Sequence, residues 1–168
     1  MNQLPTPPDN HQWVLTEDGS YTLYSKHFDE AAHSVHGAQE ETKLRFIVGC
    51  NLPNRLKPDE THHIFEVGFG LGLGFLETFK LASNTPIHFI SCELDHALVH
   101  WCQQHLHLPY GKQYPAQAFE LLRQLKYIEQ NNLLTGTYQN FQLSILLGDV
   151  TQHTTWLKNN FSQKIDSI

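Results

Sequence analysis

The chain has 168 residues, of which 40% are hydrophobic and 17% are charged, so its length supports one hydrophobic core and its composition excludes a disordered chain. The net charge of −6 excludes a bulk positive field that would gather nucleic acid. Any contact with RNA would therefore need a local patch or a partner domain.

The spacing of the cysteines and histidines argues against disulfide bonds and against a metal site. Cys50, Cys92 and Cys102 are an odd set without C-x-x-C spacing, which fits reduced thiols in the cytoplasm. His96 and His100 have the i, i+4 spacing of zinc ligands, but no third ligand accompanies them. The N-terminus lacks signal-peptide features, and no apolar run approaches the ~18 residues of a membrane span. We expect a soluble cytoplasmic protein without a metal site.

Residues 1–60 predict an arm, a hairpin and a helix. Residues 1–11 are polar and Pro-rich, which indicates an extended arm. Two apolar segments, 12–15 and 21–24, flank a turn with Asp18-Gly19 that tolerates positive φ, which predicts a hairpin. Residues 38–48 have helical apolar spacing and an acidic first turn, and Gly49 with residues 51–53 should end this helix. We take 12–60 as one N-terminal unit.

Strands and helices alternate in residues 61–168. The predicted strands are 64–67, 87–92 and 141–147, and the predicted helices are 75–82, 95–105, 115–128 and 154–160. Apolar strands separated by helices predict a Rossmann-like α/β fold, a parallel sheet with helices on both faces. Three parallel strands are about half the six of a doubly wound sheet, so we expect a C-terminally incomplete fold.

A glycine-rich turn follows the first of these strands, with Glu66 ahead of Gly68, Gly70 and Gly72. Such a turn brings the backbone close to a ligand. The P-loop pattern is absent, and Leu73 stands where a dinucleotide fingerprint needs its third glycine. A carboxylate before the turn suits a ligand with a cationic amino group, and S-adenosylmethionine (SAM) is the common nucleoside of that kind.

Two further carboxylates end the next strands. Glu93 lies where doubly wound nucleotide binders hold ribose hydroxyls, with Asp95 as the second choice for this role. Asp149 follows the third strand, where it could accept a hydrogen bond from an adenine amine. All three positions fall at the carboxyl edge of the predicted sheet, where open α/β folds bind ligands.

Two segments together resemble the methyltransferase domain of the MnmC-type tRNA wobble-uridine enzymes. They are G-A-Q-E-E-T at 37–42 and F-E-V-G-F-G-L-G-L-G-F-L at 65–76. The resemblance implies SAM-dependent methylation of an aminomethyl nitrogen that completes 5-methylaminomethyl-2-thiouridine in tRNA. Many such enzymes are fused to an FAD-dependent oxidase domain, and we expect no FAD in this chain.

The resemblance also implies site residues. The residues that it assigns to cofactor binding are Glu66, Gly68, Phe69, Gly70, Gly72, Glu93 and Asp149. The residues that it assigns to a segment closing over the cofactor are Tyr24, Glu41 and Thr42. Leu71 and Gly74 replace the Thr and Asn that are more common there. The family continues from residues 164–168 into a strand with a D-x-F-x-P motif, so we expect the catalytic Asp beyond Ile168 and mainly cofactor binding in this chain.

Other interpretations stay open. The chain could be a non-catalytic module that binds a nucleoside or SAM, or an NAD-dependent oxidoreductase, which Leu73 disfavours. Because the strand at 64–67 should lie at an exposed edge of the sheet, we also expect a dimer or another segment to cover that edge.

Overall fold

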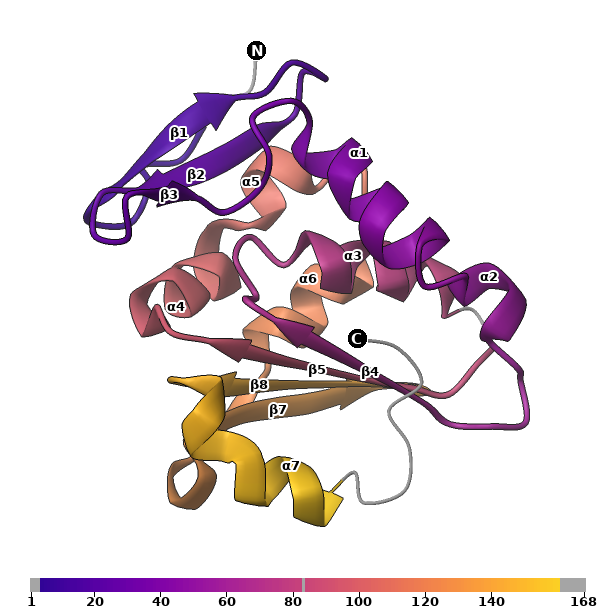
Figure 1. Ribbon diagram of the computed structural model, residues 1–168. Coiled ribbons are helices and arrows are strands. Elements are labelled where there is room, and N and C mark those ends of the chain that lie inside the picture. Colours follow the sequence, from indigo (N-terminus) through magenta and orange to yellow (C-terminus); the bar gives the residue numbers. More distant parts are fainter. Residues whose placement is uncertain (1–3, 83, 161–168) are drawn as a thin grey trace.

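The computed structural model describes residues 4–82 and 84–160, which form two sheets (Figure 1). The antiparallel N-terminal sheet has the order β1-β2-β3, and the larger sheet has the order β4-β5-β8-β7-β6. The strands are β1 His11–Leu15, β2 Tyr21–Ser25, β3 Glu30–Ala31, β4 His62–Val67, β5 Ile87–Glu93, β6 Lys126–Ile128, β7 Leu133–Tyr138 and β8 Phe141–Leu147.

Helices connect and cover these strands. They are α1 Ala38–Thr42, η1 Lys43–Val48, α2 Leu52–Arg55, α3 Leu73–Leu81, α4 His96–His105, α5 His107–Tyr110, α6 Ala116–Arg123, η2 Glu129–Asn131, η3 Val150–His153 and α7 Thr154–Asn160. None of the helices in the described ranges is long and apolar enough to cross a membrane.

The predicted hairpin is confirmed, with Leu15 opposite Tyr21 and His11 opposite Ser25. Asp18 stabilises its turn by accepting hydrogen bonds from the Thr16 hydroxyl at 2.6 Å and from the Ser20 amide at 2.9 Å. The predicted helix over 38–48 is present as α1 continued by the π-helical η1. The helix is capped by Gly49, as predicted. Residues 51–53, which we also expected to end it, include Leu52 and Pro53, the first two residues of α2.

The Rossmann-like arrangement is confirmed, with β4, β5 and β8 parallel as predicted. The sheet is mixed, however, because β7 and β6 add antiparallel strands that the sequence pattern did not reveal. Gly136 lies within β7 and serves packing, since an added Cβ would lie 3.0 Å from Cδ2 of Leu125, which follows α6.

The predicted helix over 115–128 was too long. Helix α6 ends at Arg123, and Ile128 lies in β6 with 39% of its surface exposed. Leu125 is buried although it lies outside the helix, so the apolar spacing continued past the helix end and gave a false period.

Alternate side chains of the sheet pack on opposite faces. Phe89 and Leu143 join the large core that contains α3, α4 and α6 residues, whereas Ile90 and Leu146 join a second cluster packed against Trp156 of α7. Helices therefore cover both faces, as predicted (Figure 1). Cys92 is 3% exposed within the second cluster, and this burial raises its pKa to about 12, which fits a core residue.

The N-terminal sheet lies over α4 and near the carboxyl ends of β4 and β5 (Figure 1). Trp13 and Trp101 pack edge to face with ring centroids 5.6 Å apart. Their indole N–H groups donate to the carbonyl oxygens of Pro5 and Thr6, each at 2.8 Å. The predicted arm is thus attached to α4 by the buried indole of Trp101 and the partly buried indole of Trp13.

Candidate functional site

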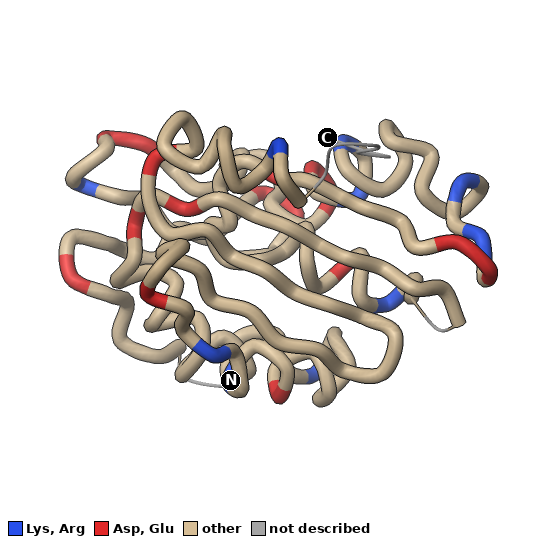
Figure 2. The backbone as a smooth tube through the Cα atoms, turned by 90° about the horizontal axis from the view of Figure 1, so that it is seen from below, with Lys and Arg blue, Asp and Glu red and all other residues tan. Residues whose placement is uncertain are grey.

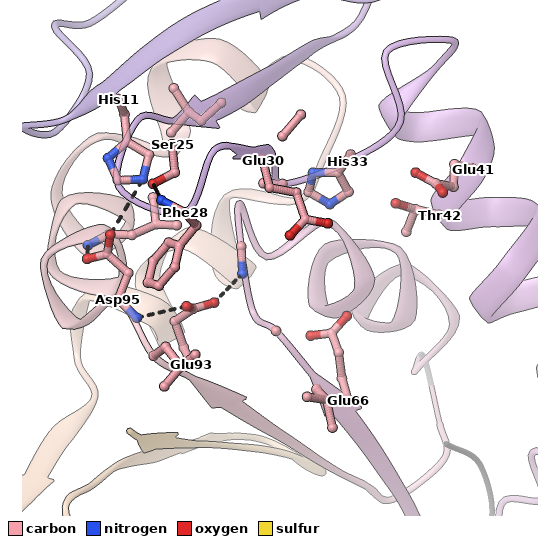
Figure 3. A pocket seen from close by; sticks show the side chains of 18 of the residues that line it. His11, Ser25, Phe28, Glu30, His33, Glu41, Thr42, Glu66, Glu93 and Asp95 are labelled. Carbon is pink, nitrogen blue, oxygen red and sulfur yellow. Dashed lines mark hydrogen bonds and ion pairs between the residues drawn. The ribbon is translucent and has the colours of Figure 1, made fainter. Parts of the chain in front are cut away.

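A cavity of about 510 Å³ lies between the N-terminal sheet and the carboxyl edge of β4 and β5 (Figure 3). This volume is in the range of small-molecule sites. Its roof comes from the N-terminal sheet and α1, and its floor comes from the two loops that follow β4 and β5. Parallel strands end at one edge, which is why residues far apart in the sequence meet there.

The glycine turn forms one side of the floor. Gly68, Gly70 and Gly72 have φ angles of 86°, 53° and 65°, values that glycine adopts without strain. A Cβ added at Gly68 would meet nothing within 4 Å, so its backbone is open to the cavity. A Cβ at Gly72 would lie 2.6 Å from Phe69 Cζ, so this glycine serves packing of the turn.

Glu66 is 5% exposed and lies at the base of the cavity. It accepts a hydrogen bond from Ser91 Oγ at 3.1 Å, and a Cβ at Gly74 would overlap its Oε1. Burial raises the pKa of Glu66 to about 8. The carboxyl is therefore protonated at neutral pH unless a cation lies against it.

Glu93 joins the two floor loops. Its Oε2 accepts from the Gly70 amide and its Oε1 accepts from the Asp95 amide, both at 2.9 Å. These bonds fix the carboxylate at the cavity wall and leave each oxygen a further lone pair for a ligand hydroxyl. Asp95 also lines the cavity, and its Oδ1 accepts from the Leu98 amide at 3.0 Å, which caps α4.

The predicted roof residues divide into two groups. Glu41 and Thr42 line the cavity. Glu41 accepts from the Ser34 amide at 2.6 Å and pairs with Arg45 at 3.1 Å. Tyr24 is outside the lining and its hydroxyl donates to Asp29, which raises the pKa of Tyr24.

Three predicted floor residues also lie outside the lining. Phe69 is 1% exposed and stacks on Phe75, so its side chain belongs to the core, and Gly72 packs against it. Asp149 is exposed and accepts from the Thr151 amide at 2.8 Å and hydroxyl at 2.7 Å, which lowers its pKa. The cavity thus unites six of the predicted residues: Glu66, Gly68, Gly70, Glu93, Glu41 and Thr42.

Several lining residues were missed by sequence reasoning, among them His11, Phe28, Glu30 and His33 (Figure 3). They come from the N-terminal unit, whose placement over the sheet no local pattern encodes. Burial lowers the pKa of His33 to about 4, so this ring is neutral. Two other lining residues that we did not predict, Val67 and Leu94, could have been found from the sequence. Each is an apolar residue directly after a carboxylate at the end of a strand.

The lining is strongly acidic. Among the described residues it includes five carboxyl side chains and one guanidinium, that of Arg45, and the carboxyl groups are those of Glu30, Glu41, Glu66, Glu93 and Asp95. Val67 and Leu94, 62% and 57% exposed, add an apolar surface between Glu66 and Asp95. A cationic ligand with an apolar face fits this combination. No cluster of three His, Cys, Asp or Glu that could hold a metal occurs in residues 4–82 and 84–160.

Comparison with known proteins points to one family. No family model matches the chain. The bifunctional protein MnmC of Acidovorax sp. (strain JS42), named for tRNA 5-methylaminomethyl-2-thiouridine biosynthesis, is 39% identical over 87 residues, or 49% of this chain and 13% of that protein. The MnmC protein of Azoarcus sp. (strain BH72) is 38% identical over 97 residues, or 51% of this chain and 15% of that protein. About half of this chain is thus similar to a part of the MnmC proteins.

The fold has a solved counterpart in MnmC2 from Aquifex aeolicus, with a TM-score of 0.65 and 23% sequence identity. The match covers 93% of this chain and 48% of the Aquifex chain. The chain thus spans about half the length of its structural relative and matches a small part of the bifunctional MnmC proteins. The fold expected from the resemblance is confirmed. Residues 164–168, from which the family continues into a further strand, lie outside the described residues.

Proposed function

We propose that this chain binds SAM and supplies the cofactor-binding part of a methyltransferase that acts on the aminomethyl nitrogen of a wobble uridine in tRNA. The observation that carries this proposal is the cavity over the glycine turn, in which Glu66 and Glu93 end adjacent parallel strands. Homology to proteins named for 5-methylaminomethyl-2-thiouridine biosynthesis supports the reaction class.

The lining fits the chemistry of SAM group by group. Glu66 and the open backbone at Gly68 would hold the cationic amino acid portion, and Glu93 would accept from the ribose hydroxyls. Val67 and Leu94 offer apolar surface to the adenine. Glu41 and Thr42 in the roof would keep water from the cofactor. The four other predicted residues would act indirectly. Phe69 and Gly72 would do so by packing the turn, and Tyr24 and Asp149 through their hydrogen bonds to Asp29 and Thr151.

SAM supplies a methyl group on a positively charged sulfur, a good leaving group. The acceptor nitrogen attacks as a neutral amine, forms the nitrogen–carbon bond as the sulfur–carbon bond breaks, and loses a proton to a base. The residues of this chain would bind and orient the reactants, which is the main requirement of such a displacement. The base is expected to be the Asp of the D-x-F-x-P motif.

Partners and compartment belong to the same proposal. Lys and Arg positions are scattered along the backbone rather than gathered in a stripe, which supports weak contact of this chain alone with tRNA (Figure 2). An FAD-dependent oxidase would act on the preceding intermediate as a fused or separate protein. The free thiols of the buried Cys92 and Cys102 support a cytoplasmic location.

Calorimetric titration with SAM tests the proposal. We expect saturable binding to the wild type, a loss of at least tenfold in affinity for Glu93→Ala, because ribose contacts and the floor geometry are both lost, and no change for the exposed control Glu60→Ala. Thermal unfolding of each variant checks that the fold is intact. Binding of NADH in place of SAM would overturn the proposal in favour of an oxidoreductase.

A further inference from the structure

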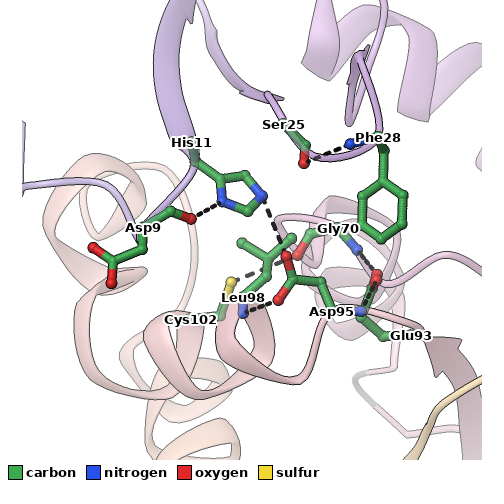
Figure 4. Close-up of polar contacts among 9 residues, drawn as sticks. All are labelled: Asp9, His11, Ser25, Phe28, Gly70, Glu93, Asp95, Leu98 and Cys102. Atoms are coloured by element: carbon green, nitrogen blue, oxygen red, sulfur yellow. Dashed lines mark hydrogen bonds and ion pairs between the residues drawn. The ribbon is translucent and has the colours of Figure 1, made fainter.

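His11 lies at the junction between the N-terminal sheet and the first turn of α4 (Figure 4). Its side chain is 4% exposed, with Nδ1 2.9 Å from the carbonyl oxygen of Asp9 and Nε2 3.5 Å from Asp95 Oδ2. A carbonyl oxygen only accepts hydrogen bonds, so Nδ1 carries a proton. In a neutral ring, Nε2 would then direct a lone pair at the Asp95 carboxylate.

The imidazolium form removes this conflict, because Nε2–H then faces Asp95. The other groups near the ring do not compete for that role. Glu93 at the end of β5 is acidic, Ser25 opposite His11 on β2 is uncharged, and the Asp9 carboxylate points away from the ring (Figure 4). On α4, burial raises the pKa of the Cys102 thiol, whose Sγ is 3.6 Å from the Gly70 carbonyl oxygen, so it too stays uncharged.

Asp95 transmits the contact to the cavity floor. Its Oδ1 caps α4 at Leu98, its amide donates to Glu93 Oε1, and Glu93 Oε2 accepts from the Gly70 amide. A continuous chain of contacts therefore runs from the N-terminal sheet through His11 and Asp95 to both floor loops. Because His11 pairs with Ser25 in the sheet, displacement of His11 would also shift the roof of the cavity.

We propose that His11 is a positioning residue of the cavity: its imidazolium ties the N-terminal sheet to Asp95 and so holds the roof over Glu93 and the Gly70 turn. Loss of the hydrogen-bond donor that faces Asp95 loosens this tie and weakens ligand binding. The choice of probe rests on the proposed function, whereas the tie itself does not.

The test compares the affinities of two His11 variants for S-adenosylhomocysteine. His11→Asn can replace Nδ1–H but cannot reach Asp95, and we expect it to bind about fivefold more weakly than wild type. His11→Gln can donate an amide N–H to Asp95 and should stay close to the wild-type affinity.

His36→Asn is the matched control, because His36 Nδ1 is 3.0 Å from Glu17 Oε1 in an ion pair that is mostly exposed and outside the cavity lining. Its affinity should equal that of the wild type. Equal losses of affinity in His11→Asn and His11→Gln would overturn the proposal, since only His11→Gln keeps a donor to Asp95.

Hydrogen exchange of the protein without ligand separates this proposal from the proposed function. Protection of residues 93–98 should be lower in His11→Asn than in the wild type and close to the wild-type level in His11→Gln. Equal protection in the two variants would overturn the positioning role even if S-adenosylhomocysteine does not bind. Failure of the probe to bind, with the expected exchange pattern, would overturn the proposed function alone.

Discussion

At Glu66, burial opposes the charge that a cationic ligand requires. The pKa of about 8 in the folded chain exceeds the ordinary value of 4.5, so the native state holds a proton that the unfolded state releases between these pH values. The contribution of this carboxyl to stability is therefore lost progressively as pH rises from about 4.5 to 8. Ligand binding should reverse the preference, because a nearby cation favours the ionised form.

We predict that Glu66→Gln stabilises the fold relative to wild type by an amount that grows with pH, reaching on the order of 2 kcal/mol or more by pH 8. Urea unfolding at pH 5.0, 6.5 and 8.0 measures this difference, with the exposed Glu129→Gln as a control that should show none. The same variant should bind SAM more weakly, since an amide offers no negative charge. A difference in stability that is constant with pH would contradict the burial of a neutral carboxyl.

At the scale of the element, the glycine turn between β4 and α3 has two different ends. Gly68 and Gly72 share positive φ angles, but only at Gly72 would an added Cβ meet a buried ring, that of Phe69. The first end is therefore available to a ligand, and the second fixes the packing of the turn on α3.

We predict that Gly72→Ala costs ~2–4 kcal/mol of unfolding free energy, because backbone strain adds to a clash, whereas Gly68→Ala costs ~1 kcal/mol from strain alone. The two substitutions should differ in the opposite direction in their effect on ligand binding. Relative to its effect on stability, Gly68→Ala should reduce SAM affinity more strongly than Gly72→Ala. Chemical unfolding and calorimetry measure the two quantities. Equal destabilisation by both substitutions would contradict the division of roles.

At the scale of the molecule, β4 is the edge strand of the five-stranded sheet in the described part of the chain, as the sequence predicted. The side chains of Ile64 and Phe65 in this strand are covered, at 5% and 9% exposed. One side of the backbone of β4, however, has no strand partner among the described residues. A second copy or a further segment that pairs with β4 would satisfy these backbone groups.

We predict that the isolated chain self-associates through this edge. Light scattering should give an apparent mass that rises with concentration, and the unfolding temperature should rise with it, because association stabilises the folded state by mass action. A monomeric mass at every concentration, with an unfolding temperature independent of concentration, would contradict this.

Sequence alone determined the elements whose signals are local. The hairpin around Asp18-Gly19, the three parallel strands and the floor residues Glu66, Gly68, Gly70 and Glu93 were predicted, since alternation, turn residues and strand ends define positions that parallel pairing then brings together. Strand β6 was missed because the apolar spacing of α6 continues to Ile128. Strand β7 was missed because Gly136 interrupts the alternation of its side chains, and only the packing of α6 against this glycine shows its role.

Only the tertiary structure decided the roof of the cavity and the roles of several assigned residues. Packing of the N-terminal sheet over α4 brings His11, Glu30 and His33 to the cavity. This contact joins distant segments of the chain, so no periodic pattern in the sequence predicts it. Phe69 and Asp149 lie within recognisable motifs, yet core packing and helix capping turn them away from the cavity. Motifs determine where the backbone turns, whereas the direction of each side chain depends on what packs against it.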